Sequence, residues 1–327
     1  MTQSLTLDSM RQALGTALIH SALGGFARAQ SLRPRNRPSK WGVERIRGVE
    51  YGGAGQPAQT LDVYRPLESE GLLPVVLYVH GGGFSILSKE SHFQFGLRFA
   101  QAGALVFNID YRLAPKHPYP AGFEDVCAAW LWVLDNAERY GGDPSRIVLA
   151  GESAGGGLIT SLALATSASF DNAWATEVFQ RDAQPVGVIP ACPMSQVSEP
   201  ERYGARRPLP TWIADRIDVI GKRYLRDAAE LSSIDLANPL LWLESNATLA
   251  RELPPFMIPC GSRDAIRSDS DDLHAALVAR GQRSSLHLYA GEPHAFHAFP
   301  GRPHTATCWS DMLSFLRTHT TLAQRAA

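Results

Sequence analysis

The stretch Ile147-Val148-Leu149-Ala150-Gly151-Glu152-Ser153-Ala154-Gly155 joins a run of apolar residues to a Gly-x-Ser-x-Gly pentapeptide. The apolar run is typical of a strand buried on both faces, and a helix is predicted to begin near Ser153. In such a strand-to-helix turn the serine hydroxyl is held exposed, because the flanking glycines carry no side chains that would clash. N–H groups at the start of the helix favour negative charge that develops nearby. We therefore predict that Ser153 is a nucleophile.

Strands and helices alternate on both sides of this stretch. We predict strands at 61–64, 75–79, 104–109, 147–150, 256–258 and 285–289, and helices near 91–102, 121–139, from 153, 270–280 and 307–324. This rhythm indicates an α/β fold with a doubly wound, mostly parallel sheet and helices on both faces. The rhythm breaks between about 192 and 249, which we interpret as a cap inserted into the α/β core.

A second glycine-rich segment, His80-Gly81-Gly82-Gly83-Phe84, follows the predicted strand 75–79. Glycines let a loop approach a substrate closely with its N–H groups turned inward. The N–H groups of Gly82, Gly83 and Ala154 are therefore predicted to form an oxyanion hole. The alternatives are a flexible turn or a phosphate-binding loop, although the Gly-x-Gly-x-x-Gly spacing of a dinucleotide site is absent here.

A nucleophilic serine needs a histidine base that is oriented by a carboxylate. In α/β-hydrolases the chain order is Ser, acid, His, and Asp264 and His294 satisfy it after Ser153. Both follow predicted strands, where ligand sites lie in open α/β sheets. The rival acids are predicted to cap the following helix, and the rival histidine to pack or bond locally: Asp269, Asp271, Asp272 and His297.

Several spaced motifs together carry a family resemblance. They are His-Gly-Gly-Gly-Phe at 80–84, Tyr-Arg-Leu-Ala-Pro at 111–115, Gly-Glu-Ser-Ala-Gly-Gly at 151–156, Asp264, and His-Ala-Phe at 294–296. In this order they resemble the hormone-sensitive-lipase-like (bacterial family IV) carboxylesterases of the α/β-hydrolase superfamily. The resemblance implies an eight-stranded catalytic domain, here 46–192 and 246–327, under a helical cap formed by 1–45 and 193–245. It also implies the triad Ser153, Asp264 and His294.

The chain departs from the family pattern at two points. Glu152 stands before the nucleophile, where the family often has Asp or Thr, and we predict for it a structural hydrogen-bonding role. Ala265-Ile266 follows the acid in place of the usual Pro-Leu, which leaves the detail of the acid loop open. His80 is predicted to support the glycine loop.

The resemblance predicts a serine carboxylesterase (EC 3.1.1.-) that hydrolyses short- to medium-chain acyl esters through an acyl-enzyme intermediate, without a metal or an organic cofactor. Candidate pocket walls, which could equally be cap core, are Phe84, Trp41, Tyr203 and Trp212. The alternatives are a lactonase, a natural-product deacetylase or an amide hydrolase with the same triad. A non-catalytic ligand receptor on this fold is a further alternative, but such proteins commonly lose a triad member and here all three positions are filled.

Charge and composition restrict the partners. The 327 residues contain 31 Lys+Arg and 32 Asp+Glu, which argues against the global basic field of a nucleic-acid binder. Two segments of the presumed cap are nevertheless basic: six basic residues oppose one acidic residue in 28–45, and seven oppose three in 201–226. They form either a solvated surface or a site for an anionic substrate. We expect a small-molecule ester as partner, and a homodimer is compatible with the sequence.

The four cysteines are scattered without a Cys-x-x-Cys pair, which favours free thiols in a reducing, cytoplasmic compartment. No apolar run reaches the roughly 18 residues that span a bilayer, so we expect no membrane span. Residues 1–26 are predicted as an amphipathic helix. The alternative for this segment is a signal peptide with a cleavage site at Ala27-Arg28-Ala29.

Overall fold

The computed structural model of the chain describes residues 33–53, 58–226 and 235–326, together with six single positions between 15 and 29. These six positions are helical. The remainder of the predicted 1–26 helix, with its signal-peptide alternative, lies outside the described residues. No helix in the described part of the chain combines the length and the mean hydropathy that crossing a bilayer requires.

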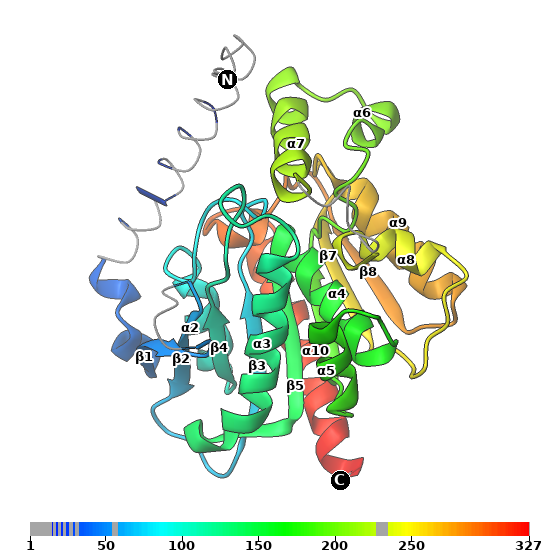
Figure 1. Cartoon of the computed structure of the whole chain (residues 1–327). Helices are drawn as coiled ribbons and strands as arrows, with labels where there is room; N and C mark the ends of the chain where they lie inside the picture. The colour runs from blue at the N-terminus through cyan, green and yellow to red at the C-terminus, as the bar shows by residue number, and fades with distance from the viewer. Residues whose placement is uncertain are drawn as a thin grey trace.

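One sheet of eight strands runs through the described residues (Figure 1) in the order β1-β2-β4-β3-β5-β6-β7-β8. The strands are β1 (Val43–Glu50), β2 (Thr60–Pro66), β3 (Leu73–Val79), β4 (Leu105–Ile109), β5 (Gly142–Glu152), β6 (Gly187–Ala191), β7 (Phe256–Gly261) and β8 (Ser284–Tyr289). β2 pairs antiparallel with both β1 and β4, and every other pairing is parallel. The mostly parallel, doubly wound sheet is therefore confirmed.

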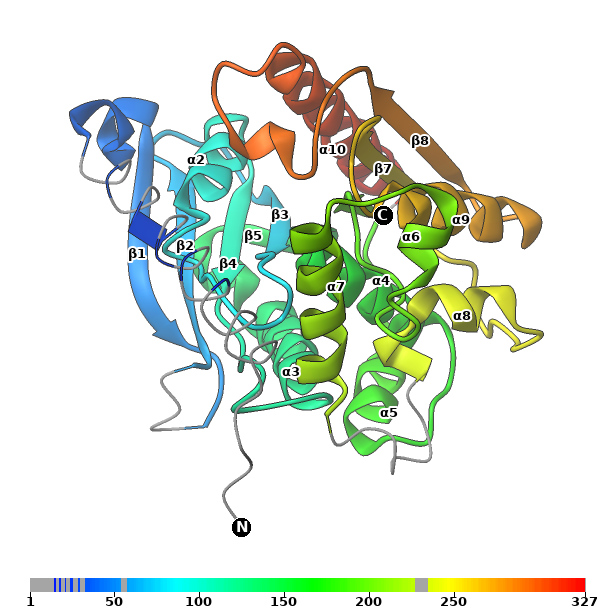
Figure 2. The same cartoon turned by 90° about the horizontal axis from the view of Figure 1, so that it is seen from above.

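Helices cover both faces of the sheet. They are α2 (Phe93–Gln101), α3 (Ala121–Asn136), α4 (Ala154–Ser167), α5 (Ala173–Gln180), α6 (Arg202–Arg206), α7 (Thr211–Tyr224), α8 (Pro239–Glu244), α9 (Arg267–Ala279) and α10 (Thr305–Ala326), with short 3₁₀ turns η1 (Pro34–Asn36), η2 (Pro38–Trp41), η3 (Ala137–Tyr140), η5 (Asp235–Ala237) and η6 (Phe296–Ala298). Seen from above, α2 and α10 lie on one side of the sheet and α3 and α5 on the other (Figure 2).

The alternation of side chains along a strand explains why the sheet needs two layers of helices. In β3, Val75, Leu77 and Val79 belong to the core cluster that includes residues of α3, α4 and α9. Val76 and Tyr78 between them belong to the other core cluster, with residues of α2 and α10. All five side chains are buried, so the continuous apolar run of β3 is satisfied on both faces.

The segment between β6 and β7 supplies the cover over the sheet. α6 and α7 stand above the carboxyl ends of the strands (Figures 1 and 2). α8, by contrast, packs against α9 and α4 of the core, although it lies within the predicted cap range 193–245. At the other predicted boundary, residue 46 falls inside β1, so the first three residues of that strand, 43–45, belong to the predicted N-terminal cap segment.

The topology gathers the predicted motifs at one edge. The glycine-rich segment follows β3, Ser153 follows β5, Asp264 follows β7 and His294 follows β8. Because β3, β5, β6, β7 and β8 are successive parallel neighbours, their carboxyl ends open on the same side of the sheet.

Candidate active site

Ser153 occupies a strained turn between β5 and α4. Its backbone has φ 51° and ψ −120°, a conformation that costs a non-glycine residue about 1–3 kcal/mol. The turn is tight on both sides: a Cβ on Gly155 would lie 2.1 Å from the Val79 carbonyl oxygen, and one on Gly151 would lie 2.8 Å from the backbone of Gly155. The two flanking glycines are therefore required by close backbone packing.

His294 and Asp264 form a hydrogen-bonded pair beside this serine. Nδ1 of His294 lies 2.8 Å from Oδ2 of Asp264, whose side chain is fully buried. The other carboxylate oxygen accepts the N–H of Ile266 at 2.9 Å, which fixes the carboxylate plane. Burial lowers the pKa of His294, but the Asp264 carboxylate opposes this and the net pKa lies well above its ordinary 6.5. Such a pair orients an imidazole and stabilises its protonated form.

Cys192 lies next to this pair, at the end of β6. Its sulfur and the ligand atoms of Asp264 and His294 all lie within 4.8 Å of one another, the one set with metal-ligand spacing among the described residues. Burial raises the pKa of the Cys192 thiol, which disfavours the thiolate that metals bind. Asp264 and His294 also already hydrogen-bond to each other. We therefore interpret the set as part of a proton-transfer site.

The glycine-rich loop presents backbone donors to the same space. Gly82 and Gly83 have φ 115° and 56°, and the loop closes on itself through hydrogen bonds from the N–H groups of Ser85 and Ile86 to the Gly82 carbonyl. The N–H groups of Gly82, Gly83 and Ala154 donate to no acceptor within the described residues. Unused N–H groups in the segments next to Ser153 are the donors that an oxyanion hole needs.

Glu152 is buried between the Ser153 turn and the glycine loop. Its Oε1 accepts a 2.8 Å hydrogen bond from Nε2 of His92 and would lie 2.6 Å from a Cβ on Gly81. Its Oε2 has no hydrogen-bond partner among the described residues and lies 3.8 Å from Nε2 of His297. Burial raises the pKa of Glu152, but His92, with His297 farther off, lowers it to about 2. The carboxylate is therefore charged, and its contact with His92 is the structural hydrogen bond expected for it.

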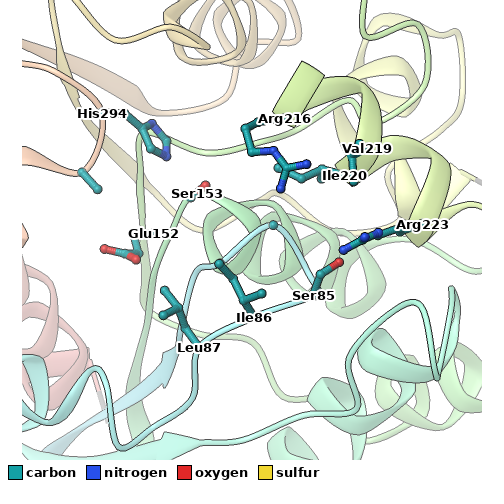
Figure 3. Close-up of a pocket in the computed structure, with 13 residues that line it drawn as sticks. Ser85, Ile86, Leu87, Glu152, Ser153, Arg216, Val219, Ile220, Arg223 and His294 are labelled. Atoms are coloured by element: carbon teal, nitrogen blue, oxygen red, sulfur yellow. The ribbon is translucent and has the colours of Figure 1, made fainter. Parts of the chain in front are cut away.

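A cavity of about 230 Å³ connects these groups (Figure 3). Its walls are the glycine loop, the Ser153 turn, the His294 loop and one face of α7. The lining residues are Gly82, Gly83, Ser85, Ile86, Leu87, Glu152, Ser153, Arg216, Val219, Ile220, Arg223, His294 and Ala295. Ser153 and His294 thus share one cavity with the glycine loop, and Asp264 lies behind His294.

The structure describes all four aromatic residues that were predicted as pocket walls, and none of them lines this cavity. Phe84 is buried and stacks on Tyr224 with ring centroids 3.9 Å apart. Trp41 is half-buried and packs against the core on the α2 side, and Trp212 is 64% exposed on α7. Tyr203 is buried and lines a separate depression near Asp264. The alternative that they pack within the core and cap fits Phe84, Trp41 and Tyr203.

The rival acids make other contacts, and the helix cap predicted for Asp269, Asp271 and Asp272 is wrong. Asp269 is buried in α9 and accepts the N–H of Ser195 at 2.7 Å and the hydroxyl of Tyr203 at 2.8 Å, so it ties the cap segment to the core. No side chain caps the start of α9. Asp271 and Asp272 pair with surface arginines of α9 and α6.

The sequence interpretation counted Arg216 and Arg223 in the basic segment 201–226, but it did not place them in the cavity wall. It missed the apolar residues of α7 and of the 85–87 segment. In α7, Arg216, Val219, Ile220 and Arg223 follow the spacing i, i+3, i+4, i+7 of one helical face, which a helix prediction over 211–224 would have revealed. Which face turns toward the serine depends on how the cap packs.

Comparisons with known proteins agree with this fold. The family model described as alpha/beta hydrolase fold matches residues 76–298. Carboxylesterase NlhH of Mycobacterium tuberculosis (strain CDC 1551 / Oshkosh) is 34% identical over 272 residues, covering 83% of this chain and 80% of NlhH. The hyperthermophilic esterase of the archaeon Pyrobaculum calidifontis superposes with a TM-score of 0.72 at 26% identity, covering 97% of this chain and 99% of that one. Esterase B of Lactobacillus rhamnosis (HN001), 20% identical, shares the fold with a TM-score of 0.74 over 94% of this chain and 98% of its own.

Proposed function

The chain belongs to the hormone-sensitive-lipase-like family of the α/β-hydrolase fold and is a carboxylic ester hydrolase, and we propose that it cleaves short- to medium-chain acyl esters with the triad Ser153, His294 and Asp264. One observation carries the proposal. The hydrogen-bonded His294–Asp264 pair and three unused N–H groups meet around a serine that is held in a strained turn.

In the proposed acylation step, Ser153 Oγ attacks the ester carbonyl while Nε2 of His294 takes its proton. Asp264 holds Nδ1–H and stabilises the imidazolium that forms. The oxyanion of the tetrahedral intermediate accepts hydrogen bonds from the glycine loop and from the start of α4. His294 then protonates the leaving alcohol, and an acyl-enzyme remains. In deacylation the same groups act on water and release the acid.

The size of the cavity supports a short- to medium-chain acyl group. About 230 Å³ lies below the roughly 300–1,000 Å³ of pockets that enclose drug-sized ligands. The walls contributed by Ile86, Leu87, Val219 and Ile220 suit an apolar chain of that length. A palmitoyl chain would extend well beyond them.

Hydrolysis of 4-nitrophenyl esters from acetate to palmitate tests the chain length. We expect kcat/KM to peak between butyrate and octanoate, and a maximum at palmitate would contradict the proposal.

The nucleophile is tested with Ser153→Ala, which should lose at least about 10³-fold in kcat. The matched control is Ser314→Ala, because Ser314 is exposed on α10 and should leave kcat unchanged. A fluorophosphonate probe should label wild type and the control but not Ser153→Ala. An active Ser153→Ala enzyme would refute the mechanism.

A further inference from the structure

One face of α7 brings two positive charges into the wall of the catalytic cavity. Arg216, Val219, Ile220 and Arg223 line this cavity together with Ser153. In Figure 3 the side chains of Arg216 and Arg223 extend from α7 into the space between that helix and the 85–87 segment. Residues i and i+7 are two turns and about 10 Å apart along a helix, on the same face. The cavity is thus apolar in its middle and cationic at both ends of this wall.

α7 is anchored, so the position of this face is determined by packing. A Cβ on Gly83 would lie 2.6 Å from Cδ1 of Ile220, which means that Ile220 touches the oxyanion loop directly. At the end of the helix, the Tyr224 ring stacks on Phe84 and its carbonyl accepts the N–H of Tyr119 at 2.8 Å. These contacts fix the helix that carries the two arginines relative to the site of the reacting carbonyl.

The two guanidinium groups influence each other. Partial burial, followed by the charge of Arg223, lowers the pKa of Arg216, while Asp215 raises it. Arg223 forms no ion pair with any residue that the structure describes. The one carboxylate that lines the cavity is Glu152, which lies on the other side of Ser153 from Arg223 in Figure 3. An anion between the arginines would relieve their mutual repulsion and gain charge-assisted hydrogen bonds.

We propose that Arg216 and Arg223 form a subsite for an anionic group of the substrate, and that the enzyme prefers esters carrying a carboxylate a few bonds from the scissile carbonyl. Monoesters of short dicarboxylic acids are the substrate class. The inference rests on the proposed function. In the net reaction water cleaves the acyl C–O bond of the monoester, and the products are the free alcohol, the dicarboxylate and one proton. The carboxylate that binds the arginines takes no part in bond making.

Matched substrates test the preference in wild-type enzyme. Monoethyl succinate, glutarate and adipate are compared with the ethyl esters of the corresponding half-amides, which have the same shape without the charge. Ethanol release gives kcat/KM. We expect kcat/KM of at least one carboxylate ester to exceed kcat/KM of its amide partner by about 10-fold. This carboxylate-to-amide ratio of kcat/KM should fall as the salt concentration rises from about 20 to 500 mM. A ratio of one or less for all three pairs would overturn the inference.

Variants assign the effect to the residues. Arg216→Gln/Arg223→Gln should bring the ratio close to one, and Lys222→Gln should leave it unchanged, because Lys222 is on the outer face of α7 and pairs with Asp218 at 2.8 Å. The far-UV circular dichroism spectrum and the midpoint of urea unfolding, unchanged from wild type in both variants, report that each is folded. A ratio that survives in the double variant refutes the subsite. If wild type hydrolyses neither the ethyl esters nor 4-nitrophenyl butyrate, the proposed function itself fails, and the inference with it.

Discussion

Replacing Glu152 with Gln should destabilise the protein in a pH-dependent way. The carboxylate is buried, 5% exposed, and Gln keeps its shape and an oxygen that can accept the His92 hydrogen bond while removing the charge. A pKa that falls from 4.5 to about 2 on folding corresponds to about 3 kcal/mol in favour of the charged form. That figure is an upper bound, because it includes the attraction between Glu152 and a protonated His297. Burial lowers the pKa of His297 to about 4, so this histidine is uncharged at pH 7 and the attraction is absent there. We expect Glu152→Gln to lose about 2 kcal/mol of unfolding free energy at pH 7.

The pH dependence distinguishes this explanation from simple loss of packing. The pKa of Glu152 is lower in the folded chain, so its charge stabilises the fold fully above about pH 4.5, and this contribution disappears as the pH falls toward about 2. Urea unfolding of wild type and Glu152→Gln at pH 7, 4 and 3 should therefore show a difference that shrinks by about half by pH 3. Glu68→Gln, which removes the same charge from an exposed position, is the control. A difference below about 0.5 kcal/mol at pH 7, or one that grows on acidification, would refute the reasoning.

Three further predictions concern the catalytic groups. Asp264→Asn should reduce kcat by about 10⁴-fold with KM little changed, because a neutral amide does not stabilise the imidazolium and its NH₂ group can hold the imidazole in the wrong tautomer; a loss under tenfold would contradict the assigned role. The pKa of His294 is raised, and only the neutral imidazole accepts a proton. The acid limb of the pH profile of kcat/KM should therefore have its midpoint above pH 6.5 in wild type, and this midpoint should move to lower pH in Asp264→Asn. A midpoint below pH 6.5 in wild type would contradict the raised pKa. Gly82→Ala should lose at least about 10²-fold in kcat and exceed the loss in Gly83→Ala, because its Cβ would lie 2.1 Å from a backbone carbonyl whereas that of Gly83 meets only the flexible end of Ile220; equal losses would argue against this difference.

The nine residues from Ile147 to Gly155 sufficed to predict the strand, the turn and the start of the helix, because each of these features depends on residues close together in the chain. A buried strand, a turn that excludes side chains and a helix start leave their marks within a short window, as between Ile147 and Gly155. The chain order of Ser153, Asp264 and His294 then placed each residue at the end of a strand, and the parallel sheet brings those ends together. Glu152 was expected to make a structural hydrogen bond, but its partner His92 lies 60 residues away and had to be found in space.

By itself, then, the sequence determined the α/β fold, the family and the candidate reactive residues, because periodicity and turn chemistry act over short distances along the chain. Only the tertiary structure decided what faces the substrate. Phe84 stacks on Tyr224, Asp269 accepts a hydrogen bond from Tyr203 of the cap instead of capping its own helix, and Arg216 and Arg223 line the cavity. The orientation of a cap helix is set by packing against segments more than a hundred residues away, such as Ile220 against Gly83, and no pattern within the helix contains that information.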